Sequence, residues 1–472
     1  MTATDPALMP AEELLAHYAR RALSPVEVLK AVTERIARLN PGINAFAVMN
    51  PRSLEAAGES EARWRAGRPR GALDGVPVTV KDLIDLAGFP TRRGSRLTDP
   101  APVADDAPSV LGLKQQGAVV IGKTTTTEFG WKSPGDSPLH GITRNPWNKL
   151  HTAGGSSCGA AAGAAAGFGP LHLATDAGGS IRIPAAWCGV VGLKPTFGRV
   201  PQWPLGALAP VAAAGPITRT VRDAALMLSA IAGFDLRDPF SLPPEAHAGA
   251  HGEPRDWRTG IEDGVAEMRV AVLRRPGFDA PVDWEGIAAV ELAAQLLTEA
   301  GAEVEEADPE LPDTRDLFCR LRGAALLRLV GGFPETRHHM LDPGLLEVAA
   351  AHQGVPASDI LEMEALRIAT AHAMARLHQR YDLVLCPTVP GLPPLTDAPL
   401  GDPIEAVWMD WAPWTFPFNL TRQPAITVPM GCAANGLPRS VQIVAAIYRD
   451  DLVLRAARTL EVAQPFAAPE PG

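Results

Sequence analysis

Gly154-Gly155-Ser156-Ser157-Cys158-Gly159 and Asp176-Ala177-Gly178-Gly179-Ser180-Ile181-Arg182 are the two stretches that decide the fold and function expected of this chain. A serine that follows two glycines is open to close approach by a substrate, and free backbone N–H groups lie beside it. A serine that attacks a carbonyl carbon needs both features. Because an Ala/Gly-rich stretch separates Ser156 from Ser180, we expect one site that is built from two loops.

The composition is that of a folded protein with a large core. The chain has 472 residues, of which 46% are hydrophobic and 20% are charged. Its formal net charge is −10, and no run of lysine and arginine offsets this acidic balance locally. A nucleic-acid partner is therefore not expected, whereas a small neutral or polar substrate is compatible with the charge.

Targeting signals and a cysteine framework are not apparent. The N-terminus lacks the basic start and apolar run of a secretory signal, and no segment offers the roughly 20 apolar residues of a membrane span. We expect a soluble, cytoplasmic protein without a membrane partner. The five cysteines are scattered and form no CxxC pair, so neither disulfides nor a zinc site are expected: Cys158, Cys188, Cys319, Cys386 and Cys432.

Predicted strands and helices alternate along the chain. Ser24-Pro25-Val26-Glu27 has the pattern of a capping box, and the helix that it begins should stop at Asn40-Pro41-Gly42. Further helices are predicted at 110–116 and 284–300. Strands are predicted at 76–80, 118–121, 171–175, 268–273, 301–305, 383–386, 424–429 and 440–444. This alternation predicts an α/β fold with a layered sheet.

A serine nucleophile also needs a base. The histidines His140, His151 and His172 lie near the glycine–serine stretches, but none has a motif context, and a structural role is favoured for each. Lys81 follows directly on the predicted strand 76–80. A lysine shielded from water has a lowered pKa, so Lys81 could accept a proton near pH 7.

Three motifs, in this order, resemble those of the amidase signature family. They are Gly75-Val76-Pro77-Val78-Thr79-Val80-Lys81-Asp82, then Gly154-Gly155-Ser156-Ser157, then Asp176-Ala177-Gly178-Gly179-Ser180-Ile181-Arg182-Ile183-Pro184-Ala185-Ala186 with Gly189-Val190-Val191-Gly192-Leu193-Lys194-Pro195-Thr196. The resemblance continues to Gly436-Leu437-Pro438 and so covers nearly the whole chain. It implies an α/β/α layered fold, with a central mixed sheet covered by helices.

The resemblance also implies how the chain is organised. Residues 1–472 would form a single amidase signature domain. Its parts would be an N-terminal helical segment, the signature core, a variable helical or cap region and a C-terminal return to the sheet: 1–65, 66–234, 235–400 and 401–466.

By the same resemblance, Lys81, Ser156 and Ser180 form a catalytic triad. Ser180 would be the nucleophile, Ser156 a proton relay that follows a cis peptide bond, and Lys81 the base. The oxyanion hole would consist of the backbone N–H groups of Ala177, Gly178, Gly179 and Ser180. Three further residues would support these loops: Ser157, Asp176 and Arg182.

Two residues depart from the family pattern. Ala177 stands where threonine is common, and Cys158 stands where glycine is common. Compared with threonine, Ala177 keeps the backbone N–H but lacks the side-chain hydroxyl. Compared with glycine, Cys158 would narrow the access of a substrate to the site. Neither change removes a member of the triad.

A cluster of aromatic residues suggests a hydrophobic substrate. Trp408, Trp411, Trp414, Phe416 and Phe418 lie within eleven positions and could form either a pocket wall or a core patch. We place Thr127 and Cys158 near the same pocket. An apolar wall would favour aryl or bulky acyl groups.

These observations predict an amidase that hydrolyses a small amide through an acyl-enzyme on Ser180. Aryl esters and carbamates are additional candidate substrates, no metal or organic cofactor is expected, and a homodimer is left open. One alternative is the glutaminase subunit of a tRNA-dependent amidotransferase. Another is a non-catalytic binding protein on the amidase fold.

Three other motif matches have weaker support. Residues 117–124 fit the P-loop pattern, but their middle is a predicted strand instead of a phosphate-binding loop. Residues 155–159 fit the nucleophile elbow G-x-S-x-G, but no strand precedes them. A thiolate mechanism with Cys158, a lysine and Glu128, as in nitrilase-like amidases, would leave the second glycine–serine stretch unexplained.

Overall fold

An 11-stranded mixed sheet forms the centre of this computed structural model, which describes residues 5–249, 253–398, 411–467 and 469. The strands are β1 (Phe46–Met49), β2 (Pro77–Lys81), β3 (Val119–Thr124), β6 (Leu171–Asp176), β7 (Val191–Lys194), β8 (Ala213–Thr218), β9 (Arg269–Leu273), β10 (Glu303–Ala307), β11 (Leu383–Pro387), β12 (Ala425–Cys432) and β13 (Pro438–Ala445). Their order in space is β1-β3-β2-β6-β8-β7-β12-β13-β11-β9-β10. A separate two-stranded sheet joins β4 (Asp136–Ser137) and β5 (Gly141–Ile142).

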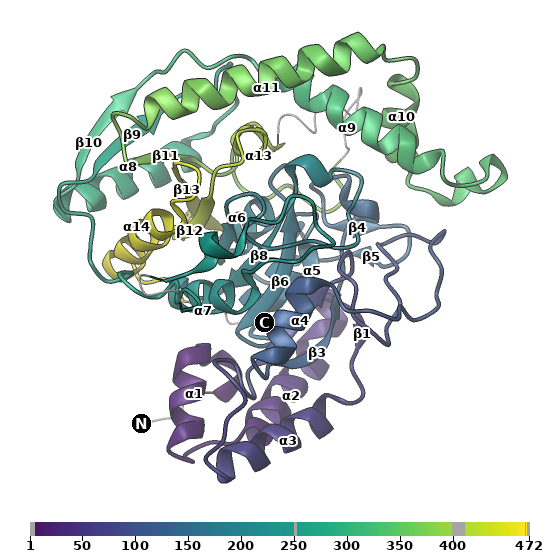
Figure 1. Ribbon diagram of the computed structural model, residues 1–472, viewed down its shortest axis with the longest axis vertical. Helices are drawn as coiled ribbons and strands as arrows, with labels where there is room; N and C mark the ends of the chain where they lie inside the picture. Colours follow the sequence, from purple (N-terminus) through teal and green to yellow (C-terminus); the bar gives the residue numbers. More distant parts are fainter. Residues whose placement is uncertain (1–4, 250–252, 399–410, 468, 470–472) are drawn as a thin grey trace.

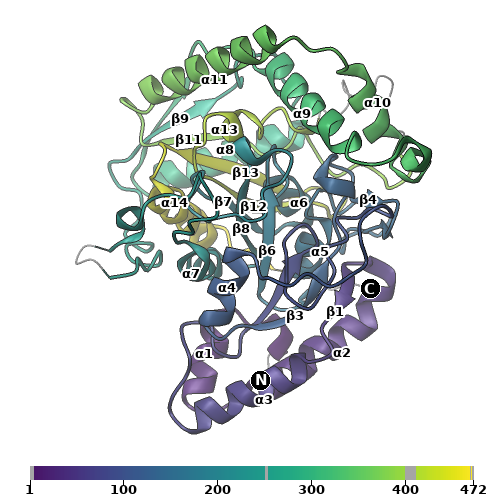
Figure 2. The same cartoon turned by 45° about the vertical axis from the view of Figure 1, so that its right-hand side comes forward.

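Helices cover both faces of the large sheet, which confirms the predicted α/β fold (Figure 1). The α-helices are α1 (Ala11–Ala19), α2 (Pro25–Ile43), α3 (Ser53–Arg65), α4 (Pro108–Gln115), α5 (Cys158–Ala166), α6 (Arg182–Cys188), α7 (Val221–Ile231), α8 (Trp284–Glu299), α9 (Arg315–Val330), α10 (Pro343–Ala351), α11 (Ala357–Leu377), α13 (Pro417–Leu420) and α14 (Asp450–Ala463). Helices α7, α8 and α14 pack on one face, and α5 and α6 pack on the other. The N-terminal helices α1 to α3 and the helices α9 to α11 lie at opposite ends of the molecule (Figures 1 and 2).

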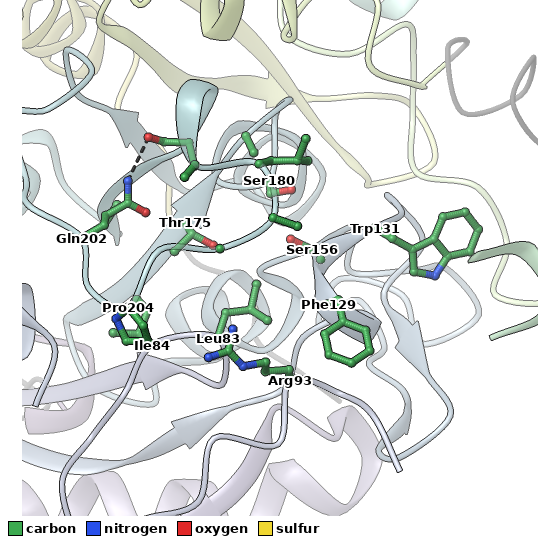
Figure 3. Close-up of a pocket in the computed structure, with 18 of the residues that line it drawn as sticks. Leu83, Ile84, Arg93, Phe129, Trp131, Ser156, Thr175, Ser180, Gln202 and Pro204 are labelled. Carbon is green, nitrogen blue, oxygen red and sulfur yellow. Dashed lines mark hydrogen bonds between the residues drawn. The ribbon is translucent and has the colours of Figure 1, made fainter. Parts of the chain in front are cut away.

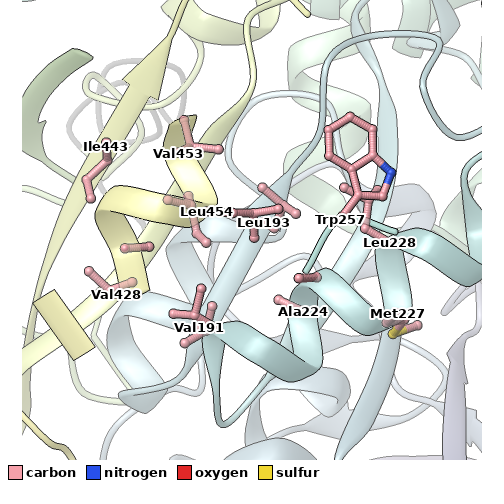
Figure 4. Close-up of a cluster of buried hydrophobic side chains, with 14 of the residues drawn as sticks. Val191, Leu193, Ala224, Met227, Leu228, Trp257, Val428, Ile443, Val453 and Leu454 are labelled. Atoms are coloured by element: carbon pink, nitrogen blue, oxygen red, sulfur yellow. The ribbon is translucent and has the colours of Figure 1, made fainter. Parts of the chain in front are cut away.

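The largest buried cluster lies between the sheet and helices α7 and α14 (Figure 4). Alternate residues of the strands point into it because successive side chains of a strand face opposite sides of the sheet. Leu193 of β7 and Ile443 of β13 are completely buried there, as is Val453 of α14. The predicted strand, helix and strand near residues 268–305 are confirmed as β9, α8 and β10, and the two strands pair in parallel.

The predicted start of α2 is confirmed, but its predicted end is wrong. Ser24 Oγ accepts a hydrogen bond from Glu27 N at 3.2 Å, and Ser24 N donates to Glu27 Oε2 at 2.8 Å, which completes the capping box. The helix continues through Pro41 to Ile43. A proline in the last turn removes only one helical hydrogen bond, and Asn44, with φ of 61°, supplies the left-handed cap that ends the helix.

Strand β2 lies between β3 and β6 and runs parallel to both. Val80 pairs with Leu173 in this register, so the carboxyl ends of β2 and β6 lie at the same edge of the sheet. Lys81 is the last residue of β2, and Asp176 is the last residue of β6. The parallel register therefore brings the first and third sequence motifs together.

The formal P-loop match, residues 117–124, overlaps strand β3. Gly122, Lys123 and Thr124 belong to strand β3, so the formal P-loop match does not form a phosphate-binding loop. Lys123 is buried and pairs with Asp82, with 2.9 Å between Nζ and Oδ1. Within the part of the chain that the structure describes, no helix combines the length and apolar character needed to cross a membrane.

Small residues let α5 lie close to the neighbouring backbone. A Cβ on Gly159 would lie 2.2 Å from Ala45 O and 2.6 Å from Thr125 N, so this position has no room for a methyl group. In contrast, a Cβ on Gly58, inside α3, would meet no atom within 4 Å.

We expect these two glycines to respond oppositely to replacement by alanine. Gly58→Ala should raise the free energy of unfolding by about 0.5–1 kcal/mol, because alanine favours a helix interior over glycine. Gly159→Ala should lower it by about 1–3 kcal/mol through overpacking. Denaturant unfolding of both variants checks this pair, and a Gly159→Ala variant as stable as the parent protein would contradict the close packing of α5.

Candidate active site

The three motifs meet at the carboxyl edge of β2 and β6. Lys81 comes from the end of β2, Ser156 from the loop before α5, and Ser180 from the loop between β6 and α6. Ser156 and Ser180 line the same cavity, and Figure 3 shows both side chains close together at its upper side. The backbone N–H of Ser157 donates to Ser180 O at 3.2 Å, which joins the two loops directly.

The ammonium nitrogen of Lys81 is enclosed by hydroxyl groups. Its Nζ lies 2.8 Å from Ser156 Oγ, 2.7 Å from Ser157 Oγ and 3.0 Å from Thr175 Oγ1. The Lys81 side chain is completely buried, and none of these three partners is charged. The arrangement holds the amine in place without stabilising its positive charge as a carboxylate would.

Burial lowers the pKa of Lys81 to about 7, although the charge of Asp176 acts in the opposite direction. Removing water disfavours the charged ammonium form more than the neutral amine. A substantial fraction of Lys81 is therefore neutral near pH 7. A neutral amine has a lone pair, so it can accept a proton from the Ser156 hydroxyl.

The segment that carries Ser156 is tightly confined. The peptide bond between Gly155 and Ser156 is cis. A Cβ on Gly155 would lie 2.9 Å from Ser133 O and 3.0 Å from Lys132 O, so the chain needs glycine at this position. Thr127 N also donates to Ser156 O at 3.3 Å.

A buried ion pair shapes the loop that carries Ser180. Asp176 accepts hydrogen bonds from Gly179 N at 2.8 Å and from Arg182 Nε at 3.0 Å. Burial alone would raise the pKa of Asp176, but the charge and hydrogen bonds of Arg182 hold it well below its usual range. The carboxylate therefore stays ionised and closes the loop around Ser180.

Arg182 connects this loop to distant parts of the chain. Its Nη1 donates to Thr415 O at 2.9 Å and to Gln442 Oε1 at 2.6 Å, while Nη2 donates to Asn419 Oδ1 at 2.6 Å. With its bonds to Asp176, all five N–H groups of the guanidinium have partners. Such full pairing is what makes a buried charge tolerable.

The hydroxyl and amide groups around Ser180 remain available. In the described part of the chain, Ser180 Oγ has no hydrogen-bond partner, and the backbone N–H groups of Gly178 and Ser180 have no backbone acceptor. The N–H of Gly179, by contrast, is already bonded to Asp176. Gly179 has φ of 129° and faces Thr415 Oγ1, which leaves no room for a side chain.

The cavity in front of the serines has mainly apolar walls. Leu326 and Leu329 of α9 contribute to it from the far end of the molecule. Gln202 lies on the other side, where its Nε2 donates to Ala212 O at 2.9 Å (Figure 3). Large apolar residues that line the cavity are Leu83, Ile84, Phe129, Trp131, Trp203 and Leu208.

Comparisons with known proteins show the family of this chain. The Amidase family model matches residues 27–454. An acylamidase of Rhodococcus erythropolis is 35% identical, over 98% of this chain and 96% of its own length. The chain belongs to the amidase family.

Other family members are similarly close. The crystal structure of a bacterial aryl acylamidase of the amidase signature enzymes has a TM-score of 0.88 and 30% identity, and the match covers 97% of each chain. A glutamyl-tRNA(Gln) amidotransferase subunit of Acidothermus cellulolyticus is 34% identical, over 96% of this chain and 94% of that protein. The protein is accordingly an amide-cleaving hydrolase.

Within this amidase, the tentative pocket residues that the structure describes do not line the cavity. Trp414 and Phe416 are buried in hydrophobic clusters, and Phe416 stacks on Phe318 with 4.6 Å between ring centroids. Trp411 borders a separate cavity with Trp187. Trp408 lies outside the described residues. Trp414 and Phe416 instead flank Thr415, whose Oγ1 donates to Gly178 O at 2.7 Å behind the Ser180 loop.

Thr127 and Cys158 are also placed behind the site. Thr127 holds the backbone of Ser156, and its own hydroxyl donates to Lys132 O at 3.3 Å. Cys158 begins α5 and is 1% exposed. Burial raises the pKa of its thiol despite hydrogen bonds with Thr143 and Thr125, so a reactive thiolate is disfavoured.

The three histidines near the motifs do not contact the side chains of Ser156 and Ser180. His172 is completely buried in β6, and its Nδ1 lies 2.7 Å from Thr79 Oγ1. Burial lowers the pKa of His172 to about 3, so the ring is neutral. His151 contacts Pro393 O, and His140 lies 3.5 Å from Asp82.

Sequence reasoning missed several residues of the amidase site. Thr175 contacts Lys81, and its place at the end of the predicted strand 171–175 was a usable signal. Asn419 bonds to Asp176 and Val211 but lies in no recognised motif. Phe129 and Trp131 follow the threonine run near Thr127, which alone does not indicate a pocket.

The pH dependence should follow the protonation of Lys81. Protons bind to its amine as the pH falls below about 7, and the resulting ammonium cannot accept a proton from Ser156. We therefore expect kcat/KM to fall about tenfold per pH unit below the pKa and to level off above it. A pH–rate profile measured while the protein remains folded checks this prediction. A profile that continues to rise toward pH 10 would instead indicate a lysine with its ordinary pKa.

Proposed function

We propose that this amidase hydrolyses the C–N bond of a small hydrophobic or aryl carboxamide through an acyl-enzyme on Ser180. The observation that carries the proposal is the contact between buried Lys81 and the Ser156 hydroxyl, at 2.8 Å, on the cavity that Ser180 also lines. A base, a relay and a free hydroxyl are the parts that nucleophilic catalysis requires.

In the proposed reaction, Ser180 Oγ attacks the substrate carbonyl carbon. Its proton passes to Ser156 Oγ, and the proton of Ser156 passes to neutral Lys81. The negative oxygen of the tetrahedral intermediate is stabilised by backbone N–H groups of the Ser180 loop, such as those of Gly178 and Ser180. The proton then returns through Ser156 to the departing amine, and water hydrolyses the ester on Ser180 by the same route in reverse.

The cavity supports an apolar substrate. Most of the residues that line it are apolar, and among the described residues no aspartate or glutamate lines it. The similarity to an aryl acylamidase points in the same direction. Aryl esters and carbamates would form a comparable acyl-enzyme and have leaving groups that depart more readily, so we propose them as additional substrates.

Labelling with a fluorophosphonate serine probe tests the nucleophile. Ser180→Ala should abolish both labelling and amide hydrolysis, because no other hydroxyl occupies its place. Cys158→Ala should retain labelling and most of the turnover, because the thiol is buried behind the site. Intact labelling of Ser180→Ala together with inactivity of Cys158→Ala would instead support a thiol nucleophile.

The second candidate is the glutaminase subunit of a tRNA-dependent amidotransferase. The similarity to the amidotransferase protein of Acidothermus cellulolyticus favours it. Free glutamine carries an ammonium group, however, and no acidic side chain among the described residues of the cavity wall would pair with it. Ammonia release from glutamine only in the presence of a partner, without anilide hydrolysis by the chain alone, would establish this alternative.

A further inference from the structure

The apolar cavity contains a positive charge for which the proposed reaction has no use. Arg93 is the single charged residue among the described residues that line it. Figure 3 shows the Arg93 side chain beneath Leu83, on the side of the cavity away from Ser180. A cation in a mainly apolar wall favours substrates that bring a complementary group.

The backbone at Arg93 is held in an uncommon conformation. Arg93 has φ of 53°, in the left-handed region that costs energy for a residue other than glycine. Its N–H donates to Asp82 O at 3.0 Å, and its carbonyl accepts from Phe129 N at 2.8 Å. Phe129, also left-handed with φ of 50°, lines the cavity as well. Two adjoining strained residues thus share one cavity wall, as is common where strain serves a binding site.

The guanidinium of Arg93 has free hydrogen-bonding capacity. The acidic group paired with it is Asp85, whose Oδ1 lies 4.0 Å from Nη2, too far for a hydrogen bond. The charge of Asp85 also acts on buried Lys123, which has its own partner in Asp82. Within the described residues, the Arg93 guanidinium makes no hydrogen bond, and its side chain is 30% exposed.

We infer that Arg93 determines specificity by binding a carboxylate of the substrate, on a part remote from the scissile amide. The planar guanidinium offers paired N–H donors that match the two oxygens of a carboxylate. The favoured substrate class is therefore a hydrophobic or aryl amide that also carries a carboxylate. This inference rests on the proposed function, because it assumes that the substrate occupies the cavity in front of Ser180.

Matched substrate pairs test this role. Succinanilic acid and butyranilide place a carboxylate or a methyl group on the acyl side. The pair of para-acetamidobenzoate and para-acetamidotoluene does the same on the amine side. In at least one pair, the parent protein should have a higher kcat/KM for the carboxylate member than for the neutral member, and the quotient of the two values is the selectivity ratio. Arg93→Met should reduce the selectivity ratio about tenfold or more, and Arg93→Lys should keep part of it.

Arg92→Met is the matched control. Arg92 is the adjacent arginine, but its Nε donates to Thr98 Oγ1 at 3.2 Å and it does not line the cavity. The selectivity ratio should remain the same in this variant. A parent protein without preference for either carboxylate, or a ratio that survives Arg93→Met, would overturn the inference.

Binding to the Ser180→Ala variant separates this inference from the proposed function. Calorimetry should show that this variant binds the carboxylate member of a pair more tightly than the neutral member, and that adding Arg93→Met removes the difference. This measurement needs no turnover. If the parent protein cleaves no anilide but the binding difference is present, the proposed function fails and the role of Arg93 stands. If it cleaves anilides and no binding difference exists, only the role of Arg93 fails.

Discussion

The buried ion pair between Asp176 and Arg182 is the interaction on which the rest of the site depends. Asp176 ends β6 and accepts the backbone N–H of Gly179, while Arg182 begins α6 and reaches α13 and β13. A single guanidinium thus joins the Ser180 loop to segments from the end of the chain. Removing one partner would leave an uncompensated charge in the core, which typically costs about 3–5 kcal/mol. The position of Ser180 is therefore coupled to the stability of the fold.

Lys81 illustrates the opposite treatment of a buried charge. Asp176 has a cationic partner and stays ionised, whereas the contacts of Lys81 are hydroxyl groups and a carbonyl, and its pKa falls to about 7. Both residues lie at the carboxyl edge of the same two parallel strands. The difference in partners separates a structural charge from a titratable base. Because the serine and threonine partners of Lys81 carry no charge, they hold its amine in place without offsetting the effect of burial on its pKa.

The strands and the three motifs were predictable because their signals are local. Val78 and Val80 indicate a strand whatever surrounds them, and the glycines before Ser156 and Ser180 indicate loops open to a substrate. The aromatic residues near Trp414 were ambiguous, because a core and a pocket wall require the same side chains. The local sequence at Pro41 predicts an end of α2 that is wrong, because Asn44 caps the helix three residues later.

Local sequence patterns are enough to predict the α/β fold, the family and the residue types available for catalysis. Which of these residues meet depends on how the chain folds in three dimensions. In the folded chain, Thr175 lies beside Lys81, and Asn419 and Gln442 bind Arg182. Trp414 does not line the cavity that Arg93 lines. The physical reason is that a strand or a loop follows from neighbouring residues, whereas burial, desolvation and pairing depend on segments that pack together from distant parts of the chain.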